Sequence, residues 1–354
     1  MAKASLAQRI SEAWYQDSGD DGLLKLLRPL SKLFTHIAKK RRLKDSREPN
    51  SNRPIVVVVG NIAVGGTGKT PLIIALVEKL REQGYKPGVI SRGYGSKAPA
   101  YPYEVSASSP VEHCGDEPLL IANLCDCPLV IDADRNQALQ QIQQDHDVDI
   151  VLSDDGLQHY RLARHIEMAV LDGSRGLGNG WCLPAGPLRE PAERLVEVDF
   201  RIINESPKQS LHSTLKGMTL ESHKMALAPM GLRNLHSGEQ RQCNTQELQA
   251  IAGKTNTVQA IAGIGNPARF FDSLKSYGLT VEAHPFDDHQ QYSEQNLSFA
   301  FNKPLLMTAK DGVKCHTLAQ QAACKDWWQL EVQAQLAEEF WSAFLARLEQ
   351  LKAS

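Results

Sequence analysis

The twelve residues GNIAVGGTGKTP, at positions 60–71, constrain the fold of this chain more than any other stretch. They follow a short run of β-branched residues over 54–59, which predicts a strand buried on both faces. Apolar residues at helical spacing then continue from Pro71 to Gln83, and Gly84 supplies a helix stop. In this context the backbone N–H groups of a glycine-rich loop wrap phosphates. The chain is therefore expected to bind a nucleoside triphosphate.

Residues 63–70 match the pattern Ala/Gly-x4-Gly-Lys-Ser/Thr, with Ala63 where the strict pattern has glycine. Lys69 is expected to reach the β- and γ-phosphates and Thr70 to ligate Mg²⁺. The predicted nucleotide-binding residues are Val64, Gly65, Gly66, Thr67, Gly68, Lys69 and Thr70.

Short apolar runs alternate with helical patterns through the middle of the chain. They predict strands at 86–90, 129–131, 149–152 and 167–171 and helices at 119–124 and 135–144. This alternation indicates an α/β fold, a P-loop NTPase-type parallel sheet domain over 51–204 with helices on both faces. A strand at 258–262 followed by a loop and a helix indicates a smaller C-terminal α/β domain over 205–354, ending in a helix over 333–351.

The first fifty residues (1–50) form a separate, amphipathic segment. Its apolar residues recur at steps of three and four: Leu23, Leu26, Leu27, Leu30, Leu33, Phe34 and Ile37. Basic residues fall between and after them, and no acidic residue occurs from 22 to 44. Pro29 predicts two short helices rather than one. The segment is interpreted as a membrane-associating helical anchor on anionic headgroups, the alternative being a surface helix packed on its own core.

Composition excludes several classes of protein. The net charge of −2 gives no indication of nucleic-acid binding. The seven cysteines lack the paired spacing of a structural zinc site, which indicates reduced thiols. No stretch has the roughly 20 apolar residues of a membrane span, nor the apolar core of a signal peptide. The chain is therefore expected on the cytosolic side of the membrane.

Acidic residues follow two predicted elements. The strand through Val151 and Leu152 delivers Asp154 and Asp155, the kind of acid that orders Mg²⁺ near a P-loop. The stretch Gly115-Asp116-Glu117-Pro118 stands just before a helix. Asp116 is either a helix N-cap or a general base for an attacking hydroxyl, and the sequence leaves both open.

Arginines gather after the predicted strands, where α/β proteins bind ligands. Arg92, Arg135 and Arg189 lie in such loops beside glycines and are expected to contact an anionic substrate. In the C-terminal domain His289 follows two acids and is either a surface residue or part of the site. The stretch 308–311 is interpreted as a charged turn after a strand.

Taken together, the motifs resemble one family. In order they read VGNIAVGGTGKTP, SRGYG, GDEP, SDDGLQHYRLARH, LDGSRGLGNGWCLPAGPLREP, PFDDH and TAKDGVK. This series is similar to the tetraacyldisaccharide 4′-kinases, which use ATP to phosphorylate the 4′-hydroxyl of the lipid A disaccharide precursor. The resemblance covers most of the chain and is weakest over about 205–250 and at the C-terminal end.

The resemblance implies a two-domain enzyme with ATP and Mg²⁺ as cofactors. Asp116 in GDEP would be the catalytic acid–base residue, and His289 in DDH would pair with it across the domain interface. Lys69 keeps its P-loop role, while Asp154 and Asp155 in SDDG would organise Mg²⁺ or the nucleophile. Arg135 and Arg189 would contact phosphate or headgroup.

The resemblance also implies the surroundings of the enzyme. Its partners would be an acylated glucosamine disaccharide phosphate and a membrane surface with anionic lipids, with no nucleic acid and no obligate protein partner. Its place would be the cytoplasmic face of the bacterial inner membrane, as a peripheral or monotopic protein.

Three other functions are consistent with a P-loop but fit the sequence less well. A membrane-targeting P-loop ATPase switch often carries a second lysine early in the loop, where this chain has Val64. A GTPase requires Asn-Lys-x-Asp, and the stretch Asn302-Lys303-Pro304 is followed by Leu305 instead. A kinase for a soluble metabolite leaves the basic amphipathic N-terminus without a role.

Overall fold

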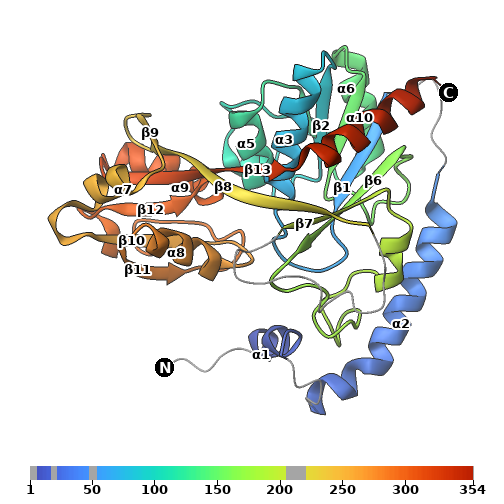
Figure 1. Ribbon diagram of the computed structural model, residues 1–354, viewed down its shortest axis with the longest axis horizontal. Helices are drawn as coiled ribbons and strands as arrows, with labels where there is room; N and C mark the ends of the chain where they lie inside the picture. The colour runs from blue at the N-terminus through green and yellow to red at the C-terminus, as the bar shows by residue number, and fades with distance from the viewer. Residues whose placement is uncertain (1–5, 17–21, 48–53, 205–220, 354) are drawn as a thin grey trace.

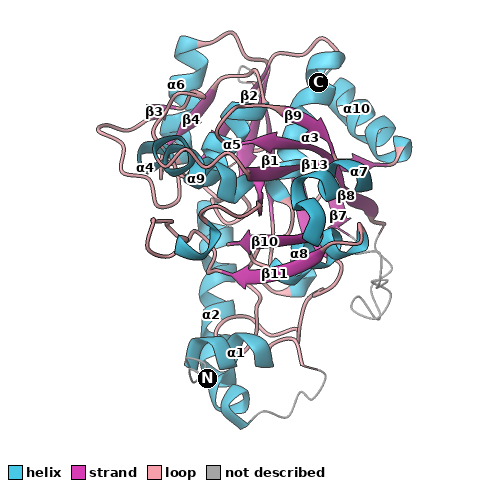
Figure 2. Ribbon diagram, turned by 90° about the vertical axis from the view of Figure 1, so that its left-hand side faces the viewer, coloured by secondary structure: helices cyan, strands magenta, loops and turns pink. Residues whose placement is uncertain are grey.

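The computed structural model describes residues 6–16, 22–47, 54–204 and 221–353. Within them the chain builds one sheet of 13 strands in the order β11-β10-β12-β13-β8-β7-β6-β1-β5-β2-β4-β3, with β9 paired to β8. Figure 1 shows the sheet passing through two parts, which we call the P-loop half (54–204) and the second half (221–336). Helices α1 and α2 lie together at one end of the molecule (Figure 2).

The P-loop half is a mostly parallel sheet. Its strands are β1 (Ile55–Gly60), β2 (Pro87–Ser91), β3 (Tyr103–Glu104), β4 (Leu129–Ile131), β5 (Ile150–Asp154), β6 (Ile166–Asp172) and β7 (Phe200–Asn204). Its helices are α3 (Lys69–Glu82), α4 (Val111–Cys114), α5 (Asp116–Leu124) and α6 (Arg135–Asp145). The strands and helices predicted here by alternation are all present, within a few residues of their expected ends.

Strand β1 lies between β5 and β6, and all six of its residues are buried. Val57 and Val59 belong to the core that α3 and α5 cover, whereas Val56 and Val58 belong to the core on the α6 side. A β-branched run suits such a strand because neither of its faces meets water. The strand therefore fixes the P-loop at the carboxyl edge of the sheet.

The second half continues the same sheet. Its strands are β8 (His223–Asn234), β9 (Gln240–Gln242), β10 (Thr257–Ala262), β11 (Thr280–Pro285), β12 (Leu305–Thr308) and β13 (Trp327–Leu336). Its helices are α7 (Thr245–Ala252), α8 (Pro267–Ser276) and α9 (Ala309–Gln321). Strand β8 pairs in parallel with β7 and antiparallel with β13, so these long strands join the two halves.

The predicted C-terminal helix over 333–351 was wrong at its start. Residues up to Leu336 belong to β13, and helix α10 (Glu338–Ala353) begins after them. Residues 333–336 each pair with a residue of β8, and that pairing overrides the helical propensity. The buried Phe340 and Phe344 of α10 pack into the core of the P-loop half, on the side of α3. Helix α10 therefore packs on the P-loop half. The domain boundary predicted at 204/205 lies between β7 and β8, which pair with each other in the sheet.

The N-terminal segment forms α1 (Leu6–Ala13) and α2 (Gly22–Asp45). The prediction that Pro29 divides the second helix was wrong, because α2 continues through it. Pro29 lies on the exposed side of the helix, where its ring meets solvent rather than packed side chains. The opposite face is anchored where the Ser31 hydroxyl donates to the Cys182 carbonyl at 2.7 Å.

Helix α2 carries apolar side chains on two faces. One face turns to the protein through the buried Leu24 and the half-buried Phe34 and Ala38. The other face is the exposed stripe of α2, formed by Leu26 (77% exposed), Leu30 (54%), Leu33 (56%) and Ile37 (49%). None of the helices within the described ranges has the length and apolar character needed to cross a bilayer.

Candidate active site

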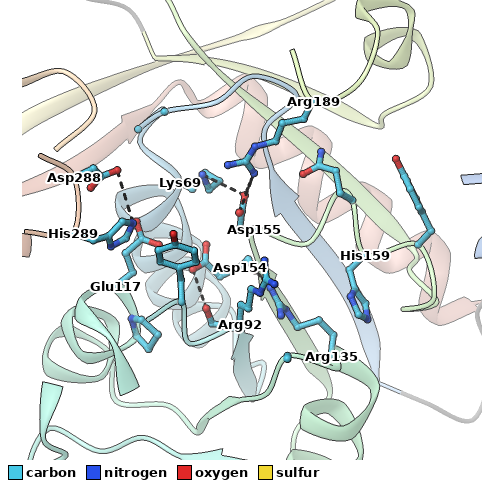
Figure 3. Close-up of a pocket in the computed structure, with 18 of the residues that line it drawn as sticks. Lys69, Arg92, Glu117, Arg135, Asp154, Asp155, His159, Arg189, Asp288 and His289 are labelled. Atoms are coloured by element: carbon cyan, nitrogen blue, oxygen red, sulfur yellow. Dashed lines mark hydrogen bonds and ion pairs between the residues drawn. The ribbon is translucent and has the colours of Figure 1, made fainter. Parts of the chain in front are cut away.

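A cavity of about 730 Å³ opens at the carboxyl edge of the P-loop half. We call it the acceptor cavity. It is lined by the P-loop, the ends of β2, β4 and β5, the start of α5, the loop around His289, and Phe34, Ile37, Ala38 and Arg41 of α2. In Figure 3 Asp154 and Asp155 stand in its middle, with His289 and Glu117 on one side and Arg135 and His159 on the other.

A second cavity of about 230 Å³ lies on the other side of the P-loop. We call it the nucleotide cavity, because residues 66–71 form one wall. Its apolar lining comes from both halves: Leu120, Leu227, Pro229, Phe270, Leu330 and Val332. Such a lining suits a nucleobase. The two cavities share Gly66, Lys69, Glu117 and Asp288, so they meet at the P-loop lysine.

The P-loop takes its shape from glycines and from a bridge to the segment around Leu188. Gly65 and Gly68 adopt positive φ angles of 110° and 93°, which glycine alone adopts readily. Ala63 sits in an isolated antiparallel bridge with Leu188, an extended conformation that needs no glycine. This bridge accounts for the alanine at the first position of the pattern.

Lys69 opens helix α3 and points to Asp155, with 3.4 Å between Nζ and Oδ1. Arg189 holds the same carboxylate at 3.1 Å. Burial alone raises the pKa of Asp155, but the charges of Lys69 and Arg189 outweigh burial and lower that pKa to about 2. Asp155 also has a φ of 47°, a strained backbone conformation of the kind that clusters at functional sites.

Asp154 is 1% exposed and points the other way. Its Oδ2 accepts a hydrogen bond from the Ser91 hydroxyl at 3.2 Å, whereas its buried Oδ1 has no partner among the described residues. Burial and the charge of Glu117 raise the pKa of Asp154, since Lys69 only partly offsets them. A buried carboxylate oxygen without a donor fits a divalent cation that supplies the missing positive charge. Thr70, the other predicted ligand, lines the nucleotide cavity.

Asp116 and His289 come together from the two halves. His289 Nδ1 lies 3.1 and 3.2 Å from the two carboxylate oxygens and must carry the proton it donates. The N-cap of α5 is Gly115, and Asp116 is the first residue of the helix rather than its predicted cap. Asp116 Oδ1 also accepts from the backbone N–H of Glu117. The hydrogen bond to Asp116 raises the pKa of His289.

The Asp116 carboxylate is 6% exposed and stays ionised. Burial raises its pKa, but the His289 hydrogen bond and the charges of Lys310 and Lys314 lower it to about 2. Lys310 Nζ lies 2.9 Å from both Glu117 and Asp288. The positive charges that surround this base candidate therefore all come from the second half.

The three predicted substrate arginines all line the acceptor cavity, in different environments. Arg92 is exposed and free to meet a ligand. Arg135 is 3% exposed and donates to the carbonyls of Asp132 and Asp154, so part of its guanidinium holds the ends of β4 and β5. Arg189 already forms an ion pair with Asp155.

A sequence model of the family described as tetraacyldisaccharide-1-P 4′-kinase matches residues 23–349. The chain belongs to this family. The tetraacyldisaccharide 4′-kinase of Stutzerimonas stutzeri is 45% identical over 350 residues, covering 97% of this chain and 98% of the relative. That of Pseudomonas aeruginosa is 45% identical over 352 residues, covering 99% of each. The crystal structure of LpxK from Aquifex aeolicus in complex with ATP shares the fold, with a TM-score of 0.71 at 23% identity over 93% of this chain and 99% of that one.

Membership of the tetraacyldisaccharide 4′-kinase family confirms the resemblance found in the sequence, and the shared fold confirms the predicted α/β P-loop architecture. Several residues of the site were missed from sequence. They are Glu117, Asp288, Lys310, Lys314 and His159, all of which line a cavity or contact Asp116. All five lie within motifs that carried the family resemblance, so membership of a motif was the available signal.

Proposed function

We propose that this chain transfers the γ-phosphoryl group of ATP to the 4′-hydroxyl of a tetraacyldisaccharide 1-phosphate lipid, at the cytoplasmic face of the bacterial inner membrane. The observation that carries the proposal is the position of Asp116 and His289. The pair lines the acceptor cavity, and the residues next to them in sequence, Glu117 and Asp288, line both cavities together with Lys69. A kinase needs a base near the phosphate loop to accept the proton of the acceptor hydroxyl, whereas a molecular switch does not need one.

ATP would place its base in the apolar part of the nucleotide cavity and its phosphates on the P-loop. Lys69 would leave Asp155 and neutralise charge on the β- and γ-phosphates. Thr70 and Asp154 would hold Mg²⁺, which supplies charge neutralisation when bound. Asp155, still paired with Arg189, would keep Lys69 aimed at the nucleotide between turnovers.

Asp116 would accept the proton of the attacking hydroxyl. Phosphoryl transfer has a loose transition state, so the proton leaves late and a weakly basic carboxylate suffices. The ionised state of Asp116 at neutral pH keeps it an acceptor. His289 would orient the carboxylate through the hydrogen bond from its Nδ1.

The other end of the acceptor cavity suits a lipid phosphate. Arg92, Arg135 and His159 gather there, across the cavity from His289 (Figure 3). Phe34, Ile37 and Ala38 of α2 add an apolar wall beside them. Sugar and phosphate would lie among the polar groups, while the acyl chains follow α2 toward the membrane.

The exposed stripe of α2 supports a peripheral attachment to the membrane. Four large apolar residues on one helical face, bordered by basic side chains and no acidic ones, match an interfacial helix. The apolar face would enter the headgroup region and the basic residues would meet anionic lipids. The acceptor would then reach the site without leaving the bilayer.

The test is a transfer reaction with the purified full chain, ATP, Mg²⁺ and the detergent-dispersed disaccharide lipid, analysed by mass spectrometry. The expected product carries one added phosphate at the 4′-position, and soluble glucosamine disaccharides are not phosphorylated. ATP hydrolysis that is stimulated by vesicles, without a phosphorylated lipid, would support the targeting-ATPase alternative instead.

A further inference from the structure

The sequence predicts a charged turn after a strand at 308–311, and the structure corrects this. Thr308 caps helix α9, and the side chains that follow turn inward. Asp311 is 0% exposed and Lys314 8%. Two charged residues buried on adjacent turns of one helix need an explanation, because burying charge is costly unless each group is paired.

Asp311 is fully satisfied. Its Oδ1 accepts from the Tyr292 hydroxyl at 2.9 Å and lies 2.9 Å from Lys314 Nζ, while its Oδ2 accepts from the Gly263 N–H at 3.0 Å and the Thr308 hydroxyl at 2.6 Å. Three hydrogen bonds and the ion pair with Lys314 engage both oxygens of the carboxylate. Asp311 is therefore fixed within the second half and holds the lysine beside it.

Lys314 reaches out of this cluster toward the other half. Its Nζ lies 3.6 Å from Asp116 Oδ2 and 5.0 Å from the centre of the Tyr292 ring. The ammonium is thus buried between two carboxylates, one in its own helix and one in α5. Asp311 is the partner of Lys314 within α9, and Asp116 is the second carboxylate that Lys314 faces.

Lys314 lines neither the acceptor cavity nor the nucleotide cavity, so it acts on neither ligand directly. Lys310 differs from it, because Lys310 lines the nucleotide cavity, pairs with Glu117 and Asp288, and lies 4.0 Å from Asp116. Among the described residues, Asp116 is therefore the one active-site group that Lys314 contacts.

We infer that Lys314 is a positioning residue, which from α9 holds the Asp116 carboxylate against His289 and keeps it ionised while the two halves are joined. This inference rests on the proposed role of Asp116 as the base. The ionisable groups that face Asp116 are His289, Tyr292, Lys310 and Lys314 from the second half, with Cys114 and Glu117 beside it in the chain. Those that face Lys314 are Asp311, Tyr292 and Asp116.

The charge of Lys314 contributes to the lowered pKa of Asp116. An opposite charge within about 4–6 Å lowers a carboxyl pKa by roughly one to three units. Removing that charge therefore raises the pKa of Asp116, and the base becomes protonated at a higher pH. Activity should then be lost progressively as the pH falls.

The experiment compares Lys314→Met with Lys314→Arg, which keeps the charge, in the full chain from pH 5 to 9. For Lys314→Met we expect kcat/KM for the lipid to fall about tenfold or more at pH 7. The ratio of variant to wild-type kcat/KM should also decrease further toward pH 5. Lys314→Arg should give a ratio that is constant with pH, and both should bind ATP within about twofold of wild type. Lys314→Gln replaces Lys314→Met if the latter does not fold.

A ratio for Lys314→Met or Lys314→Gln that does not change with pH would overturn the inference and leave Lys314 as a structural residue. Asp116→Asn separates this outcome from failure of the base assignment. If Asp116→Asn retains turnover, the proposed base itself is wrong. If it is inactive, adding Lys314→Met to it should cause no further loss, because the lysine acts through the carboxylate.

Discussion

At the scale of single residues, the site depends on side chains held in uncommon backbone conformations. His289 has a φ of 62° and Asp155 a φ of 47°. Such conformations cost of the order of 1–3 kcal/mol for each residue and persist where the surroundings determine them. Both residues face the acceptor cavity, and both hold a charged partner, Asp116 and Lys69. The strain thus coincides with the proposed chemistry.

His289→Ala should lower kcat by about 10²-fold, because Asp116 loses the donor that orients it. His289→Asn is the matched control, since asparagine tolerates a positive φ and its side-chain amide can donate from nearly the same place. It should recover a large part of the lost rate. Steady-state kinetics with saturating ATP measure both variants, and an unchanged rate in His289→Ala would reduce the DDH motif to a structural loop.

At the scale of secondary-structure elements, local signals decided what could be predicted from the sequence. The β1–loop–α3 unit was found because its buried run, its glycines and its helical spacing all lie within about thirty residues. Strands β8 and β13 were not found, because their pairing joins Met225 to Leu336, far apart in the chain. The sequence wrongly predicted a division of α2 at Pro29, because the hydrogen bond from Ser31 to Cys182 that holds the helix also joins residues far apart in the chain.

The candidate site shows the same division. The P-loop, Asp154 and Asp155 follow strands and were located by position alone. The pairing of Asp116 with His289 came only from the family resemblance, and the burial of Asp311 and Lys314 was missed. Residues of the second half reach Asp116 through tertiary packing, which no local pattern reports.

The exposed stripe of α2 gives a prediction at this scale. Leu30→Glu combined with Leu33→Glu should lower partitioning onto anionic vesicles at least tenfold, because two apolar residues are lost from the inserted face. His36→Glu, also exposed on α2, introduces an acid without removing an apolar side chain and should have a smaller effect. Co-sedimentation with vesicles measures both.

The fold of these variants is checked by their turnover of detergent-dispersed lipid, which should stay near wild type. Deleting the whole segment is a less informative experiment, because Phe34, Ala38 and Arg41 also form a wall of the acceptor cavity. Unchanged partitioning in the double variant would move the membrane contact away from α2.

At the scale of the whole molecule, one sheet carries two halves that complete each other. The P-loop half supplies the phosphate loop and Asp116, and the second half supplies His289, Lys310 and Lys314. The two also touch at the loop itself, since a Cβ at Gly265 would lie 2.3 Å from the backbone nitrogen of Gly66. Approach of the halves is therefore part of the site.

Gly265→Ala should weaken ATP binding by about ten- to a hundredfold, because the added methyl displaces the P-loop or separates the halves at a cost of roughly 1–3 kcal/mol. The affinity is measured by calorimetric titration. Gly22→Ala is the control, since a Cβ there meets nothing within 4 Å. Wild-type ATP affinity in Gly265→Ala would show that this contact does not support the phosphate loop.

The central claim is that a carboxylate from the P-loop half, completed by the second half, accepts the proton of the lipid hydroxyl. Single-turnover transfer from radiolabelled ATP by Asp116→Asn, with ATP affinity measured in parallel, tests it most directly. We predict a loss of about 10²- to 10⁴-fold in the transfer rate with ATP affinity within about twofold of wild type. Near-normal transfer by Asp116→Asn would contradict the account.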